Sequence, residues 1–74
     1  MSWNYRVMRH GNNNGDYYAI HEVYYDQNGK PRNWTDDDVG PCGESLDEVK
    51  ACLELMKEAL SKPILDYANG KEIV

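Results

Sequence analysis

The chain has 74 residues, a hydrophobic share of 41% and a formal net charge of −5. This length allows one domain with a thin hydrophobic core and a margin of stability of about 3–5 kcal/mol, which leaves little room for a deep, water-excluding active site. We therefore expect binding rather than catalysis, and the negative charge disfavours direct contact with nucleic-acid phosphates.

Residues 3–10 are predicted to form a strand, because Trp3, Tyr5 and Val7 alternate with polar side chains. Residues 11–16 are rich in Gly and Asn, which tolerate positive φ, so they predict the loop of a hairpin. Residues 17–25 are rich in aromatic and β-branched residues and predict the second strand. Both faces of that strand are largely apolar, so it is either covered on both sides or keeps one face for a partner.

Residues 26–30 predict a tight turn closed by Gly29, and residues 31–35 predict a third strand. Pro31 cannot donate a hydrogen bond to a neighbouring strand, so it marks an edge strand or a strand start. An open edge strand can pair with a second copy of the chain, which makes a homodimer one expected partner state.

Residues 36–44 predict a loop, and a helix follows it. Ser45 and Glu48 form the S-x-x-E capping box that begins helices, and Pro63 ends the helical segment. One helical stripe carries the apolar side chains of Leu46, Val49, Leu53, Met56 and Leu60. Residues 64–67 predict a short fourth strand or a docked tail, and residues 68–74 a frayed tail.

These elements predict an α+β fold: an antiparallel sheet of three, or four, strands packed on one amphipathic helix, in the order β-β-β-α(-β). Helix on sheet is the natural way to bury the apolar stripe. The domain spans residues 1–67. The sequence shows no leader with an apolar core and no apolar run of membrane-spanning length, so we expect a cytoplasmic protein without membrane contact.

Acidic and aromatic side chains are the candidate binding groups. Residues 36–58 carry eight acids against two lysines, a net charge of −6, and would attract a basic protein surface. The chain has six Tyr and two Trp but no Phe, a composition that suits half-exposed interfaces. The candidate partner-binding residues are Trp34, Tyr24, Tyr18, Asp36, Asp37, Asp38, Glu54 and Glu58.

Groups with catalytic or metal-binding chemistry are present but poorly spaced. Cys42 with His21 or His10 could pair as nucleophile and base, yet no local signature of a thiol enzyme accompanies them. The same residues with Cys52 lack the close Cys or His pairs of zinc sites. Three adjacent acids at 36–38 could hold Mg²⁺ or Ca²⁺, but such runs usually mark a solvated loop. We therefore expect no enzyme and no cofactor.

Two families show similar motifs. The motifs of the first are Trp3-x-Tyr5-Arg6, residues 18–26, Gly29-Lys30-Pro31, Trp34-Thr35 and Gly43-Glu44-Ser45. Through them the chain resembles a family of small, uncharacterised bacterial proteins over residues 3–67. This resemblance implies no activity. Residues 43–49 and 15–19 also resemble HicB-like antitoxin domains, in which strands lead through a Gly-acid-Ser-Leu-acid-acid segment into a helix. The Pro-Asp-Leu-Pro-Gly-Cys segment and the DNA-binding extension of those domains are absent.

The sequence thus predicts a small acidic interaction module that binds a protein partner, one with a basic surface. Three alternatives stay open: a phage or mobile-element inhibitor of a nucleic-acid-binding complex, such as an anti-CRISPR protein; an antitoxin-like domain; and a small metal- or thiol-dependent enzyme.

Overall fold

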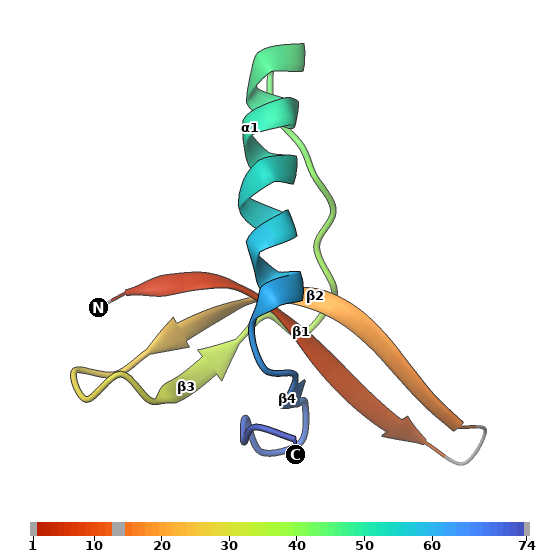
Figure 1. Ribbon diagram of the computed structural model, residues 1–74, viewed down its shortest axis with the longest axis vertical. Coiled ribbons are helices and arrows are strands. Elements are labelled where there is room, and N and C mark those ends of the chain that lie inside the picture. Colours follow the sequence, from red (N-terminus) through yellow and green to blue (C-terminus); the bar gives the residue numbers. More distant parts are fainter. Residues whose placement is uncertain (1, 13–14, 74) are drawn as a thin grey trace.

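The computed structural model describes residues 2–12 and 15–73. Its elements, in chain order, are β1 (Trp3–Asn12), β2 (Gly15–Tyr25), β3 (Pro31–Trp34), the helix α1 (Leu46–Lys57), the 3-10 helix η1 (Glu58–Ser61) and β4 (Leu65–Asp66). The strands lie in the order β3-β2-β1-β4 (Figure 1).

The α+β class and the order of elements are confirmed, but the sheet is mixed rather than antiparallel. The first three strands pair antiparallel, whereas β4 runs parallel to β1. The physical reason lies in the connection: a chain that returns through a helix to the far edge of its sheet can arrive in the parallel direction, which a tight turn does not allow.

The β1–β2 hairpin forms the centre of the sheet, with paired residues from Trp3↔Tyr24 to Asn12↔Gly15. Pairing therefore continues into the segment predicted to be a loop, because Gly and Asn can also adopt extended backbone. Of the predicted loop, residues 13–14 lie outside the described residues.

The turn after β2 and the edge strand β3 are as predicted. Asp26 Oδ1 accepts hydrogen bonds from the backbone N–H groups of Asn28 and Lys30, at 2.8 and 3.0 Å, and Gly29 has a φ of +78°. These bonds lower the pKa of the Asp26 carboxyl, because they favour its charged form. Pro31 begins β3 at one edge of the sheet.

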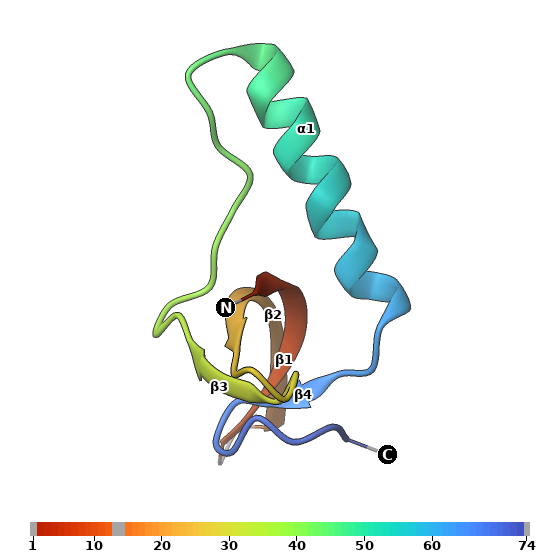
Figure 2. The same cartoon turned by 90° about the vertical axis from the view of Figure 1, so that its left-hand side faces the viewer.

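The helix begins as predicted but packs differently. The Ser45 side chain accepts a 3.2 Å hydrogen bond from the Glu48 N–H and caps α1. The expected burial of the whole apolar stripe is wrong, since only Met56 of α1 and Ala59 of η1 are buried. Figure 2 shows the reason: α1 stands away from the sheet and approaches it only at its C-terminal end. No helix within the described ranges is long and apolar enough to cross a membrane.

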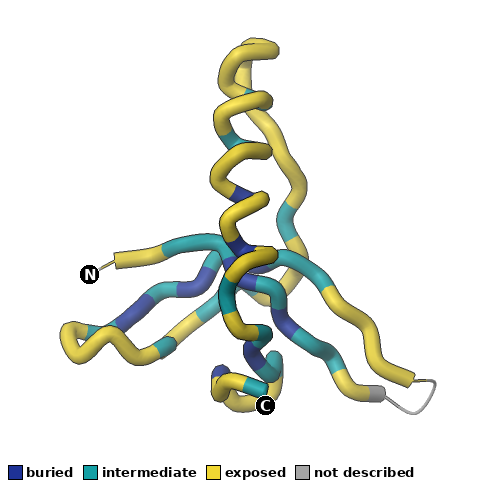
Figure 3. The backbone as a smooth tube through the Cα atoms, viewed as in Figure 1, coloured by how far each residue is buried: buried dark blue, intermediate teal, exposed yellow. Residues whose placement is uncertain are grey.

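The hydrophobic core lies on the opposite face of the sheet, under the C-terminal segment. Side chains alternate between the faces of a strand, so Met8 and Val23 point to the same side as the neighbouring Leu65 of β4. They form the core with Tyr25, and Trp34 and Tyr67 pack against it. Figure 3 shows burial concentrated where the strands cross, while most of α1 and its leading loop are exposed.

Residues 68–73, for which the sequence predicts a frayed tail, turn back over this core. The Asp66 N–H donates to Lys71 O, and the Ile73 N–H donates to Ile64 O. Gly70 is buried with a φ of +74°, and a side chain there would lie only 2.6 Å from the Trp34 ring. The segment therefore closes the core that the helix leaves open.

Candidate functional site

One hollow beside the helix lies between α1 and β2, and we call it the helix–β2 hollow. It is a cavity of about 400 Å³ whose walls are mostly apolar, from α1 and η1 on one side and from β2 and the loop before the helix on the other. Its large apolar residues in contact with solvent are Leu53 and Leu60, which are 45% and 72% exposed, and Tyr17 and Tyr18 of β2. Asp38 and Lys57 supply its charges.

A second recess lies where α1 and η1 meet the start of β1. It measures about 320 Å³ and is lined by Trp3, Tyr5, Leu55 and three polar residues. The rings of Trp3 and Tyr5 meet edge to face with 5.2 Å between their centroids, and both Trp3 and Leu55 are about half exposed. The C-terminal part of the helical segment is thus flanked by solvent-exposed apolar groups on two sides.

We call this region the helix-flanking surface and define it by the exposed large apolar side chains that line the two hollows: Trp3, Tyr17, Tyr18, Leu53, Leu55 and Leu60.

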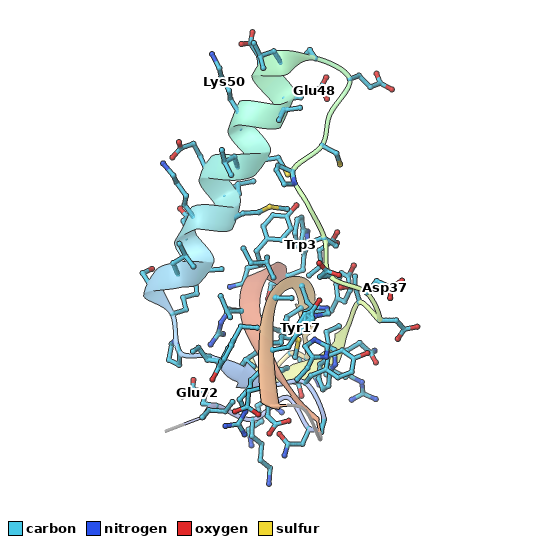
Figure 4. The ribbon with its side chains drawn as sticks, turned by 90° about the vertical axis from the view of Figure 1, so that its right-hand side faces the viewer. Trp3, Tyr17, Asp37, Glu48, Lys50 and Glu72 are labelled. Atoms are coloured by element: carbon cyan, nitrogen blue, oxygen red, sulfur yellow. The ribbon has the colours of Figure 1, made fainter. Side chains whose placement is uncertain are left out.

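The helix-flanking surface is set among acidic groups. Glu54 and Glu58 lie exposed on the helical segment. Glu54 forms an ion pair with Lys57, with 3.4 Å between Glu54 Oε1 and Lys57 Nζ. Both side chains of that pair are well exposed, so it contributes little to stability. Asp36–38 sit on the exposed loop after β3, and Figure 4 shows Asp37 pointing away from the molecule.

The structure distributes the predicted partner-binding residues between this surface and the core. Tyr18 and Asp38 line the helix–β2 hollow, and Glu58 lines the second recess. Trp34 instead packs against the core and the buried Gly70. The Tyr24 hydroxyl donates a 2.8 Å hydrogen bond to Glu22, which raises the pKa of Tyr24 because it ties the proton to the ring oxygen.

Sequence reasoning missed the leucines as candidates, since it assigned the apolar stripe of the helix to the core. One signal was available: Leu55 lies off the stripe, between Glu54 and Glu58, and so makes the helix apolar on a second side. A helix that is apolar on two sides cannot bury both against one sheet.

The two histidines form a buried network next to the core. His21 is fully buried, and its Nδ1 lies 2.9 Å from the Thr35 carbonyl oxygen, which can only accept; Nδ1 therefore carries a hydrogen. His21 Nε2 then accepts from His10 Nε2–H at 2.9 Å. Burial lowers the pKa of His21 below its ordinary 6.5, so the ring stays neutral in the folded protein.

The network is fitted for holding strands together. The His10 ring stacks between Tyr17 and Tyr67, with centroid distances of 5.0 and 4.1 Å. Together with Thr35 these rings join β1, β2 and the segments that follow β3 and β4. We read the cluster as structural, since both nitrogens of His21 and the Nε2 of His10 are occupied by contacts within the fold.

The cysteines are free thiols in different surroundings. Cys42 is exposed in the loop, and Cys52 lies on α1 with its Sγ 3.6 Å from the Tyr5 hydroxyl. That contact, with burial, raises the pKa of Tyr5 to about 12. Within residues 2–12 and 15–73, no group of three or more His, Cys, Asp or Glu side chains is placed to hold a metal ion.

The exposed area of the molecule exceeds that of a compact monomer. The accessible surface is 5454 Å², against about 4650 Å² expected from the mass of 8.5 kDa, an excess of about 800 Å². The radius of gyration is 12.9 Å, against about 11 Å for a compact chain of this length. The helix and its leading loop, which protrude from the sheet in Figures 1 and 2, contribute to both differences.

No protein-family model, curated protein or solved structure matches the chain. The resemblances to the small bacterial family and to HicB-like domains therefore stay predictions.

Proposed function

We propose that the protein acts by binding another protein, which covers the helix-flanking surface. The observation that carries the proposal is a helix held at one end only, with its leucines in solvent. A helix of 12 residues is marginal in water without packing, so α1 gains from a partner that covers it. The excess area of about 800 Å² equals what one partner buries in an interface of standard size.

The charges around this surface select the chemistry of the partner. Residues 36–58, which contain the helix and its leading loop, carry a net charge of −6. A partner should therefore present apolar side chains ringed by Lys and Arg.

The same charge disfavours a second copy in this place. A two-fold dimer brings the same patch of both subunits together, so the acidic segment would face itself. Like charges facing each other across an interface cost free energy. A different, basic protein fits better, and an inhibitor of a nucleic-acid-binding complex is a special case of this proposal.

Paired variants of the exposed leucines test the proposal. Leu53→Gln with Leu60→Gln removes apolar groups that the fold does not bury, so the folded domain should keep its melting temperature. Lys50→Gln, also exposed on α1, is the matched control. A partner isolated with the wild type and then purified should bind the leucine variant at least about tenfold more weakly and the control normally.

Hydrogen exchange on the purified complex provides the second readout. The partner should slow exchange at residues 46–60, where the free protein exchanges fast. Equal binding by the leucine variant, or protection confined to the C-terminal segment, would contradict the proposal. Light scattering of the free protein decides about the second copy: a dimer that the leucine variant dissociates would replace the proposed partner by self-association.

The acidic residues around the helix-flanking surface are tested separately. Asp38→Asn, Glu54→Gln and Glu58→Gln together should slow association several-fold and flatten its salt dependence, while dissociation changes little. An association rate that is insensitive to these changes would remove the basic character of the partner from the proposal.

A further inference from the structure

A further cavity lies on the other side of the molecule, under the C-terminal segment. It measures about 450 Å³, within the usual range for small-molecule sites. Its lining combines buried Tyr25, Leu65 and Gly70 with Arg6, and exposed residues of the β2–β3 turn and of segment 69–72 form its rim. It is therefore separate from the helix-flanking surface.

Arg6 lines this cavity with a buried guanidinium. The residue is only 7% exposed. Nη1 donates to the Tyr25 hydroxyl at 2.9 Å and Nη2 donates to the Pro63 carbonyl at 2.6 Å, while Nε has no hydrogen-bond partner. Both acceptors are neutral. The Tyr25 hydroxyl passes its own proton to Asn4 Oδ1, at 2.7 Å, so it gives Arg6 no negative charge.

Arg6 has no carboxylate partner among the described residues. The ion pairs found there join Arg9 to Asp66 and Lys57 to Glu54. Asp66, the acid of β4, is paired with Arg9 on the face of the sheet opposite to Arg6, so its carboxylate does not neutralise Arg6. A buried charge without an opposite charge is costly, which is why such groups are normally paired.

The rim of the cavity adds further positive charge. Lys30 and Lys71 line it together with Arg6, against a single acid, Glu72. The cavity thus carries three cations and one anion in a protein whose net charge is −5. Figure 4 places Glu72 at the end of the molecule away from α1, so this positive cavity and the acidic helix lie on opposite sides.

We propose that this cavity binds a small organic anion through a carboxylate or phosphate group, with Arg6 at its floor. A guanidinium has five N–H donors, and only two of those of Arg6 are used within the described residues. An oxyanion supplies the missing counter-charge to Arg6, and Lys30 and Lys71 hold its outer oxygens. The rings of Tyr25 and Pro31, which line the cavity, receive the apolar part of the ligand.

Glu72 is the internal competitor for the same cations. If its carboxylate serves as the counterion of Arg6 in solution, the cavity has no need of a ligand. Glu72→Gln separates the two cases. With a ligand site, this variant binds anions about threefold more tightly and keeps its stability. With an internal counterion, it loses stability, and the wild type binds no anion.

The test is a titration followed by nitrogen–proton NMR at constant pH and ionic strength. The probes are phenyl phosphate and benzoate, with inorganic phosphate and acetate as their counterparts without a ring. We expect saturable shifts at the amides of Gly29, Gly70 and Lys71 and at the Arg6 Nε–H. The tighter binder of phenyl phosphate and benzoate shows which charged group the cavity prefers. The ratio of its affinity to that of the probe without a ring measures the contribution of the apolar part of the cavity.

Variants of the rim lysines test the site without replacing the buried Arg6, whose loss could unfold the domain. Lys30→Gln with Lys71→Gln changes exposed residues only and should weaken binding about tenfold. Lys50→Gln, on the distant helix, should bind as the wild type does. Shifts that fail to saturate, that are equal in the rim variant, or that leave the Arg6 Nε–H unmoved would overturn the proposal.

Discussion

Substitution of Gly70 by Ala tests how the C-terminal segment closes the core. Gly70 has a φ of +74°, a conformation that costs an L-residue about 1–2 kcal/mol. An added methyl group would also lie 2.6 Å from Cζ3 and 2.8 Å from Cη2 of Trp34. Trp34 is packed against the core, so its ring has little room to move, and overpacking of this kind costs about 1–3 kcal/mol.

Gly29→Ala provides the matched control. Gly29 has nearly the same φ, +78°, but nothing lies within 4 Å of the added methyl group. The control should therefore lose about 1 kcal/mol, whereas Gly70→Ala should lose about 2–4 kcal/mol. Since the whole domain has a margin of about 3–5 kcal/mol, the second variant should be partly unfolded at room temperature.

Urea unfolding followed by tryptophan fluorescence and circular dichroism measures both free energies of unfolding. The difference between the two variants is the cost of displacing the Trp34 ring. Losses equal to within about 0.5 kcal/mol would refute the reasoning, because they would mean that residue 70 does not press on the ring. The packing of segment 68–73 over the core would then need revision.

Three further predictions concern the helix and the histidines. Met56→Ala should lower the free energy of unfolding by about 2–3 kcal/mol, because Met56 is 3% exposed. Leu60→Ala should change it by less than about 0.5 kcal/mol, because Leu60 is 72% exposed. Equal losses in urea unfolding would contradict the exposure of Leu60 on η1. Ser45→Ala removes the cap and should cost about 1 kcal/mol, with reduced helical circular dichroism at 222 nm, and an unchanged spectrum would contradict the cap. The pKa of His21 is lower in the folded than in the unfolded state, so its contribution to stability is fully present above pH 6.5 and is lost as the pH falls toward the folded-state pKa. Proton NMR should show the His21 ring titrating below 6.5, and a midpoint at or above that value would contradict its burial as a neutral ring.

The strands and the helix were predictable from local patterns. Alternation at Trp3, Tyr5 and Val7 marks β1. The turn formed by Asp26 and Gly29 connects β2 to β3 and fixes the register of these two strands next to the turn. The Ser45 cap begins the helix because it satisfies N–H groups that no earlier turn can. Each of these signals acts within a few residues, so no knowledge of distant contacts is needed.

The position of β4 was only partly predictable. Leu65–Asp66 is a strand of two residues, too short to show a period. Its parallel pairing with β1 depends on where the helical segment ends and on the ion pair from Arg9 to Asp66. The covering of the core by segment 68–73 likewise depends on the fit of Gly70 against Trp34, which are far apart in the sequence.

The candidate sites divide in the same way. The acidic character of residues 36–58 and the aromatic content are visible in the sequence, and they led to Tyr18, Asp38 and Glu58 near the helix-flanking surface. The leucines of that surface were assigned to the core, because periodicity shows which side of a helix is apolar but not what covers it. Arg6 gave no signal, since a charged residue on a strand is normally solvated.

By itself, then, the sequence determined the fold class, the first three strands and the helix, and the sign of the charge on each segment, because these follow from backbone preferences and side-chain chemistry of near neighbours. The tertiary structure decided which apolar residues are left in solvent and which charge is left without a partner. Both depend on contacts between distant segments: η1 holds the helix at one end, and β4 brings its acid, Asp66, to the Arg9 face of the sheet and not to the Arg6 face.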